Sequence, residues 1–439
     1  MAKKMIAMEE TSQTIKTNTE TIIGAQSGTR AVVDDIKKIL TEKRYRWGVR
    51  IDKNNSDPYT SVEYLYDAVG MTPAAMNFST GSFSYGSWFD WYVIKQNVPA
   101  MVKYDGTVDY YLDPQDLTKK IDGTASDVAN TAYAGNAMAK FPIIWRYQYE
   151  DGNYQYDIFS NVKYDENYEA YAFQREDGTY MKYRWHRIFK GAEVSGRLRS
   201  ISGLQPVYGK TAPQERTLAQ ANNPSGKSIW DMTANSMCDL ITGMMRLISK
   251  CDHSQSKFGN GNLNYQSSAS PTYGVLKTGT LNNKGQFWGA NDTTHQMKAF
   301  HCEAIYADQW ERVLGYLALN GVPYLKPTPP YNFTGEGFIK CGDVITGTSG
   351  GYISKTKMTK YGEVPQVVSG SETTYKCDGC WFNVSLAIGV ALRGCDCSDS
   401  GRCGFSCVDL DASGSSSIWV IGASLSCEGD EDYEVSEVA

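Results

Sequence analysis

"YQYEDGNYQYDIF", residues 147–159, places two aromatic-rich runs on either side of an Asp-Gly pair. Aromatic residues at alternating positions favour a half-buried strand, because successive side chains of a strand point to opposite faces of the sheet. Asp-Gly is a typical two-residue hairpin turn, since it tolerates the left-handed backbone that such turns require. The stretch therefore predicts an antiparallel β-hairpin.

The same pattern is present in "MVKYDGTVDYYLDPQD" (101–116) and "YAFQREDGTYMKYRWHRIF" (171–189). Their Asp-Gly pairs, at 105–106 and 177–178, also predict hairpin turns. The chain of 439 residues contains 30 Tyr, 10 Trp and 41 Gly, a composition that favours a β-rich domain with a packed core over a disordered chain. This length fits two or three average domains, or one large domain with insertions.

Helical patterns are found in three places. Residues 10–43 fit about four heptads, with Ile15, Ile22, Thr29 and Ile36 at the a positions and Asn18, Ala25, Val32 and Ile39 at d. This segment is either an oligomerising stalk or an amphipathic helix packed on its own domain. Residues 230–251 carry an apolar stripe at helical spacing, typical of a core helix. We expect a further helix within residues 301–321, which makes the predicted fold class α+β.

The formal net charge of −6 argues against a general nucleic-acid-binding protein, which usually carries a basic surface. No window of the sequence reaches the length of a membrane span, and the first residues lack the continuous apolar run of a signal peptide. We therefore expect a protein made in the cytoplasm that does not insert into membranes. Such a protein can still act outside the cell as part of a particle.

The sequence offers no established catalytic motif and no cofactor motif, so we expect no enzyme activity and no cofactor. Adjacent His301 and Cys302 could form a dyad, although neighbours in sequence seldom face each other. Of eleven cysteines, seven lie between Cys377 and Cys427. A zinc site built from Cys377, Cys380 and the following cysteines stays as an alternative, but its second pair has C-x-C spacing, which departs from the usual ribbon.

The segment Asp409-x-Asp411-x-Ser413-Gly414 is similar to the start of a calcium loop. Such a loop needs a bidentate acid at position 12, and counting from Asp409 that position is Val420. The residues after Gly414 also favour a strand over a helix. The sequence therefore predicts a surface loop here and no metal site.

Three C-terminal segments carry a specific resemblance: "TSGGYISKTKMTKYGEVP" (348–365), "SETTYKCDGCWFN" (371–383) and "SSSIWVIGASLSC" (415–427). Together with "YDGTVDYYLDPQDLTKKIDGTASDVANTAYAGNAMAKFPIIW" (104–145), they resemble phage receptor-binding and tail-fibre-like proteins that are diversified by retroelements. The similarity covers nearly everything after residue 80. It implies a C-type lectin-like fold of the formylglycine-generating-enzyme type for residues 46–427. The helical segment, residues 1–45, would precede this domain, and an acidic tail, residues 428–439, would follow it.

"MKAFHCEAIYADQWERVLGYL" (297–317) takes the place of the core segment of that family, but only Trp310-Glu311 matches its pattern. No motif matches the catalytic cysteines of the enzymes, so catalysis is not implied.

The composition of residues 380–421 provides an independent check. The resemblance implies randomisation of template adenines, chiefly in AAC and AAT codons, and codons ending in C or T cannot encode Lys, Glu, Gln, Met or Trp. Residues 380–421 contain no Lys, Glu, Gln or Met, and their tryptophans, Trp381 and Trp419, lie in segments that look invariant. The alternative interpretation is a β region of small residues with few long polar side chains.

The resemblance therefore implies a displayed surface that contacts a bacterial surface protein or glycan. It also implies attachment to other virion proteins through the N-terminus, and assembly as a homotrimer. The predicted ligand contacts are Val384, Leu386, Ile388, Cys395, Asp396, Ser398, Asp399, Cys407, Asp409, Asp411, Ala412, Ile418 and Val420. Two other functions stay open: an enzyme of the formylglycine-generating type, and a capsid decoration or head fibre without a specific ligand.

Overall fold

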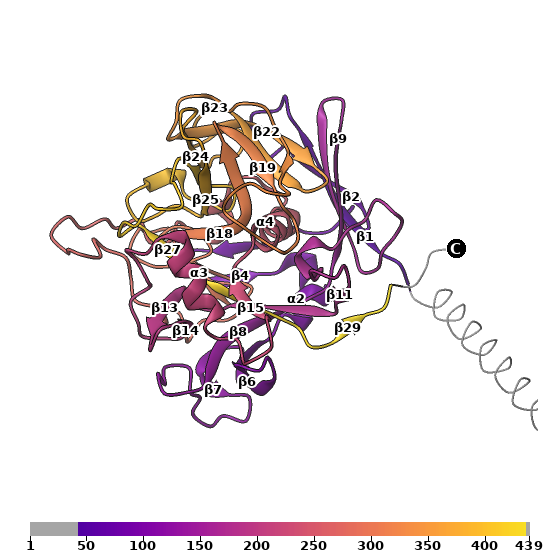
Figure 1. Ribbon diagram of the computed structural model, residues 1–439. Helices are drawn as coiled ribbons and strands as arrows, with labels where there is room; N and C mark the ends of the chain where they lie inside the picture. The colour runs from indigo at the N-terminus through magenta and orange to yellow at the C-terminus, as the bar shows by residue number, and fades with distance from the viewer. Residues whose placement is uncertain (1–42, 436–439) are drawn as a thin grey trace, which may run out of the picture.

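The computed structural model describes residues 43–435, and strands dominate them (Figure 1). The largest sheet runs in the order β20-β19-β18-β25-β26-β24-β22-β23-β21, and β27 pairs in parallel with β18. Its strands are β18 Trp310–Leu319, β19 Val322–Leu325, β20 Ile339–Lys340, β21 Thr346–Gly347, β22 Gly351–Thr359, β23 Gly362–Gly370, β24 Gly379–Phe382, β25 Gly389–Arg393, β26 Val408–Leu410 and β27 Ile421–Ala423.

A second sheet has seven strands in the order β15-β28-β12-β8-β5-β6-β7. They are β5 Pro99–Lys103, β6 Val108–Asp113, β7 Asp116–Lys120, β8 Gly135–Pro142, β12 Tyr183–Arg187, β15 Trp230–Met232 and β28 Leu425–Glu428. Because β28 lies between β15 and β12, the C-terminal part of the chain completes this sheet.

A third sheet has the order β2-β1-β10-β9, with β1 Arg46–Asp52, β2 Val62–Tyr66, β9 Trp145–Asp151 and β10 Tyr154–Ser160. The predicted β9–β10 hairpin is present, but its turn lies one residue later than predicted: Asp151 still pairs with Tyr154, so the turn residues are Asn153 and Gly152, whose φ is 56°. Across it, the Tyr149 and Tyr156 rings stack at 4.5 Å. Four strand pairs stand apart: β3 Ala75–Asn77 with β4 Ser82–Ser84, β11 Tyr180–Met181 with β29 Asp432–Tyr433, β13 Gly191–Val194 with β14 Arg197–Ser200, and β16 Lys298–Ala299 with β17 Cys302–Glu303.

The two other predicted hairpin turns are also confirmed. Gly106 and Gly178 have φ angles of 90° and 87°, values that residues with a side chain rarely adopt. The first turn joins β5 to β6, and the second precedes the short strand β11.

Helices are few and short among the described residues: α2 Tyr92–Gln96, α3 Ala212–Gln220, α4 Asn235–Ser249 and α5 Ser254–Phe258, with 3-10 turns η1 Gly86–Trp88, η2 Tyr171–Phe173 and η3 Ser400–Arg402. The predicted class, α+β, is therefore wrong, and the domain is β-rich. No helix precedes β1 within residues 43–435, and the predicted helical segment, residues 10–43, lies outside them except for its last residue.

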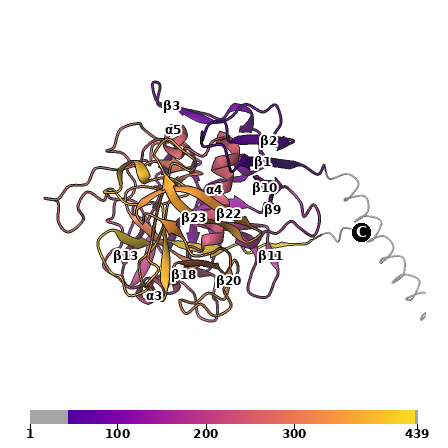
Figure 2. The ribbon, with the colours of Figure 1, turned by 90° about the horizontal axis from the view of Figure 1, so that it is seen from above.

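The predicted core helix is confirmed in α4, which lies in the centre of the molecule between β1 and the β22–β23 hairpin (Figure 2). It begins later than predicted because residues 230–232 pair with β28 as β15. Its apolar stripe is buried, with no side chain more than 4% exposed: Met237, Leu240, Ile241, Met244, Met245 and Ile248.

The helix expected within residues 301–321 is wrong, because Trp310–Leu319 form β18. This strand pairs with β19 and β25, and all of its residues but the last are buried. The predicted acidic tail is paired in its first part, since β29 joins β11 and Lys182 contacts Glu431 at 3.2 Å. No helix of residues 43–435 is long and apolar enough to span a membrane.

Candidate functional site

The three strands within residues 380–421 place the predicted contacts at two separate ends of the sheet. β24 and β26 run parallel, with Phe382 opposite Leu410, so the chain leaves both strands at the same end. We call this end, residues 383–388 with Asp411, the β24 edge. β25 runs antiparallel to β26, and the connection between them, residues 394–407, lies at the other end. We call this connection the disulfide loop.

The β24 edge exposes apolar side chains. Val384 is 49% exposed, and Leu386 and Ile388 are half-buried. The backbone is fixed underneath, since the Asn320 N–H donates to the Leu386 carbonyl at 3.1 Å and the Val390 N–H donates to the Ala412 carbonyl at 2.8 Å. A rigid backbone below exposed side chains allows residues to change with little effect on the core.

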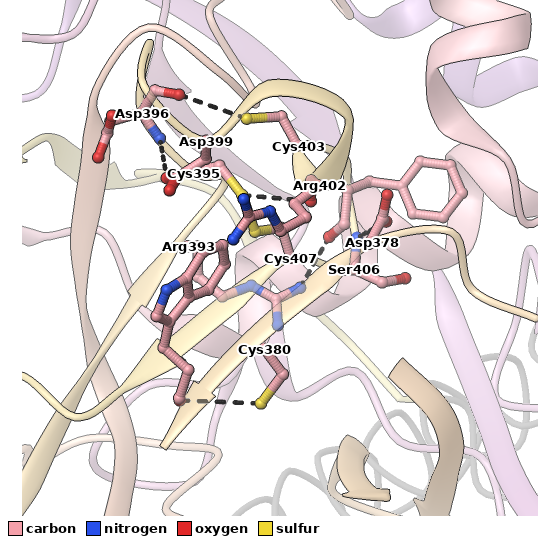
Figure 3. The surroundings of a disulfide bond; sticks show 12 residues. Asp378, Cys380, Arg393, Cys395, Asp396, Asp399, Arg402, Cys403, Ser406 and Cys407 are labelled. Carbon is pink, nitrogen blue, oxygen red and sulfur yellow. Dashed lines mark hydrogen bonds between the residues drawn. A yellow bond between two sulfur atoms is a disulfide. The ribbon is translucent and has the colours of Figure 1, made fainter. Parts of the chain in front are cut away.

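The disulfide loop is closed by a bond between Cys395 and Cys407 (Figure 3). The bond spans 12 residues, and a loop of this length gives a stabilisation of about 3 kcal/mol in the chain-entropy account. The Cys403 thiol, also buried, donates to the Asp396 carbonyl at 3.4 Å. Cys395 and Cys407 were predicted as ligand contacts, but they are fully buried and cannot present side chains to a partner.

Asp378 holds the disulfide loop in place through hydrogen bonds. Its carboxylate accepts the Ser406 N–H at 2.8 Å and the Ser254 hydroxyl at 3.3 Å. Gly404 is needed here, because a Cβ at this position would lie 2.0 Å from the Asp378 Oδ1 atom. Arg393 adds a hydrogen bond from its guanidinium to the Phe405 carbonyl, at 3.0 Å (Figure 3). Burial raises the pKa of Asp378 to about 8.

Two further carboxyl groups lie close together in the disulfide loop. The Asp396 N–H donates to Asp399 at 3.0 Å, and the exposed Ser398 hydroxyl donates to Asp396 at 2.6 Å. Burial raises the pKa of Asp396, and burial together with the Asp396 charge raises the pKa of Asp399 to about 7. Of these three predicted contacts, Ser398 is exposed, Asp399 is half-buried and Asp396 is buried.

The raised pKa of Asp399 predicts a pH-dependent stability. The folded state binds the Asp399 proton more tightly than the unfolded state does, so protonated Asp399 stabilises the fold. This stabilisation is complete below pH 3.8 and is lost as pH rises towards about 7. Because Asn stays neutral, Asp399→Asn should not lose this stability as pH rises. At pH 8 its free energy of unfolding should exceed that of wild type by about 1–2 kcal/mol, after allowance for partial exposure. Urea unfolding at several pH values measures the difference. Asn383→Ser, on the exposed β24 edge, is the control, and parallel profiles for Asp399→Asn and wild type would contradict the assignment.

Asp409 and Ala412 are also predicted contacts that the structure places inside, at 9% and 7% exposure. Asp409 lies on β26, an inner strand of the sheet with β24 on one side and β25 on the other. Burial and the charge of Asp411 raise its pKa well above the usual aspartate value. Of the two acids in the calcium-like motif, only Asp411 is exposed. The two carboxylates therefore do not form a surface pair.

An aromatic patch lies beside the disulfide loop. Ile418 is 54% exposed, Val420 is half-buried, and between them the Trp419 ring lies 4.8 Å from Tyr273 and 5.8 Å from Tyr265. The Cys397 thiol donates to the Tyr273 carbonyl at 3.7 Å, which joins the patch to the loop. Neither tyrosine was predicted as a contact, because both lie more than a hundred residues before the variable-looking region and no motif marks them.

The cysteines of the alternative zinc site are not brought together. Within residues 43–435, the metal-compatible group is Cys395, Asp399 and Cys403, whose ligand atoms lie within 4.8 Å of one another. It does not include Cys377 or Cys380. Cys395 is oxidised here, so this group could supply two thiolates only after reduction of the disulfide. The His301–Cys302 pair is buried, and burial raises the pKa of the Cys302 thiol to about 12, the opposite of an activated nucleophile.

The sequence matches no known family model and no curated protein. Among solved structures, it is similar to PvdO from Pseudomonas aeruginosa at 11% identity and a TM-score of 0.31, over 68% of this chain and 96% of that chain. A similarity of this degree carries no conclusion about activity or ancestry.

Proposed function

We propose that the protein is a virion adhesin that binds a bacterial surface receptor through the β24 edge and the surface around the disulfide loop. The observation that carries the proposal is the combination of composition and exposure in residues 380–421. The segment has no Lys, Glu, Gln or Met, which agrees with the codons that diversification by a retroelement produces at its variable positions, and it exposes the apolar side chains Val384 and Ile418. Exposed apolar groups on a fixed backbone are favourable contacts for a partner surface.

The exposure of the predicted residues narrows the proposed contact surface. Val384, Ser398, Asp411 and Ile418 are exposed, and Leu386, Ile388, Asp399 and Val420 are partly so. The buried Cys395, Asp396, Cys407, Asp409 and Ala412 would shape the loops without touching the receptor. We extend the proposed surface to Tyr265, which is 46% exposed beside Trp419. Several copies on one particle would raise the apparent affinity of a protein that binds its receptor weakly on its own.

Saturable binding of the purified full-length protein to candidate host cells tests the proposal. Val384→Ser with Ile418→Ser should weaken binding at least about tenfold, since the few contacts that dominate an interface cost about 2 kcal/mol or more each when truncated, and these two are the most exposed large apolar side chains of the proposed surface. The matched control is Val69→Ser with Ile121→Ser, which alters two side chains that are 67% and 73% exposed elsewhere on the molecule. Equal binding by both variants would rule out this contact surface. Absence of binding to every host would favour a structural decoration.

A further inference from the structure

A cavity of about 300 Å³ lies between the β1–β10 sheet and β22, outside residues 380–421. Residues from eight separate stretches of the chain form its wall, among them Asn54, Ser61, Asp252, Lys355, Lys357 and Lys376. Its volume is at the lower end of the range for small-molecule sites, about 300–1,000 Å³. Fifteen of the sixteen lining side chains carry at least one polar atom, and their aliphatic and aromatic parts form the rest of the wall with Ile51.

The inner wall of the cavity contains unsatisfied polar groups. Ser61 is 3% exposed, and its hydroxyl has no hydrogen-bond partner. Lys376 is 4% exposed and contacts Asp252 at 3.1 Å and Glu363 at 2.9 Å. An ammonium group has three donors, so one donor of Lys376 is not used by these two carboxylates. A ligand with oxygen acceptors would satisfy it.

The mouth of the cavity carries an excess of positive charge. Lys355 and Lys357 are exposed on β22, and neither has an ion-pair partner among residues 43–435. Two acids of the wall are paired with cations: Glu150 contacts Lys53 at 3.4 Å, and Asp252 pairs with Arg246 at 2.5 Å and with Lys376. Asp52 accepts only the neutral Asn54 N–H, at 2.9 Å, so one acid charge stands against the two lysines. Two lysines without partners at the mouth therefore favour an anionic ligand.

We propose that this cavity binds a sugar acid, a single saccharide unit that carries a carboxylate. The carboxylate would lie between Lys355 and Lys357. The hydroxyl groups would meet the Asn54 amide and the Tyr375 phenol, which offer both donors and acceptors. The amides of Asn55 and Gln366 would add only their second N–H and second lone pair, because each already bonds within the protein, Asn55 to Asp57 and Thr60 and Gln366 to Asp343 and Pro365. This site does not depend on the adhesin proposal. If that proposal holds, the cavity adds an invariant contact to an acidic surface polysaccharide beside the variable one.

Calorimetric titration of the full-length protein with D-glucuronate tests the site, with D-glucose and inorganic phosphate as the neutral-sugar and simple-anion probes. Glucuronate should bind saturably, at least tenfold more tightly than either of the other probes. Lys355→Gln with Lys357→Gln should weaken glucuronate binding at least tenfold. Lys360→Gln, an exposed lysine at the end of the same hairpin that does not line the cavity, should bind as wild type does.

Three results would overturn the proposal: no saturation with glucuronate, unchanged affinity in the double lysine variant, or phosphate binding as tight as glucuronate binding. The Val384→Ser and Ile418→Ser variant separates the two proposed sites. It should bind glucuronate normally even where it fails to bind cells, so the failure of one proposal leaves the other measurable.

Discussion

Replacement of Glu311 by Gln is expected to destabilise the protein by about 3–5 kcal/mol, because it leaves two buried cations without a counter-charge. Glu311 lies on β18, and its Oε2 atom is 2.6 Å from the Arg187 guanidinium and 3.4 Å from the Lys190 ammonium. All three side chains are 5% exposed or less. Arg187 ends β12 of the seven-stranded sheet, so this cluster joins the two largest sheets of the molecule.

The same cluster predicts sensitivity to acid. Burial alone would raise the pKa of Glu311, but Arg187 and Lys190 hold it at about 2, below the ordinary value of 4.5. The folded-state pKa is depressed, so the stabilisation is complete above pH 4.5 and is lost as pH falls towards 2. Urea unfolding of wild type and Glu311→Gln should therefore differ most at neutral pH and converge in acid. A constant difference from pH 7 to pH 3 would show that the charge of Glu311 is not what stabilises the fold.

The hairpins and α4 could be predicted from sequence because their signals are local. An Asp-Gly pair between aromatic runs fixes a turn through its own backbone preferences, and the stripe of α4 has the helical period. β18 gives no such signal. "WERVLGYLAL" is buried on both faces, so it lacks the alternation of a half-buried strand, and its Leu, Ala, Glu and Arg residues favour a helix when taken alone. Pairing with β19 and β25 overrides that preference.

The candidate surface could be predicted only in part for a related reason. Asp and Cys at positions that look variable suggest solvent exposure, which is correct for Asp411 but not for Asp409, two residues earlier. Whether an aspartate is exposed depends on its place in the sheet: Asp409 lies on β26, an inner strand flanked by β24 and β25, whereas Asp411 follows the end of that strand. The Cys395–Cys407 pairing was equally out of reach, because seven clustered cysteines allow many connectivities. Tyr265 and Tyr273 are distant in sequence and become part of this surface only because the fold places their rings against Trp419.

Arg312, next to Glu311, points to the opposite face of β18 and secures the segment that precedes Ile418. Its Nε atom donates to Glu215 of α3 at 2.6 Å, and both side chains are fully buried. Its two terminal nitrogens donate to the carbonyls of Ser413 and Ser416, at 3.2 and 2.7 Å. One guanidinium therefore compensates a buried acid and holds the backbone of residues 411–420.

Arg312→Met should destabilise the protein by about 3–5 kcal/mol, because buried Glu215 loses the one cation that pairs with it among residues 43–435. Burial already raises the pKa of Glu215 to about 7 with Arg312 present, so little else favours the ionised form. The double variant Arg312→Met with Glu215→Met should recover most of this loss, since packed apolar residues often replace a buried ion pair at little net cost. Chemical unfolding measures both variants.

Measurements on the backbone of residues 411–420 distinguish the two roles of Arg312, which are to neutralise Glu215 and to bind the carbonyls of this segment. In the double variant the carbonyls of Ser413 and Ser416 still lack their donor, so amide hydrogen exchange in this segment should stay faster than in wild type although global stability returns. Binding to host cells should also weaken in the double variant, because Ile418 would no longer be held in one position. Wild-type exchange in the double variant would mean that β27 and the Trp419 contacts alone order the segment, and that Arg312 serves only to neutralise Glu215.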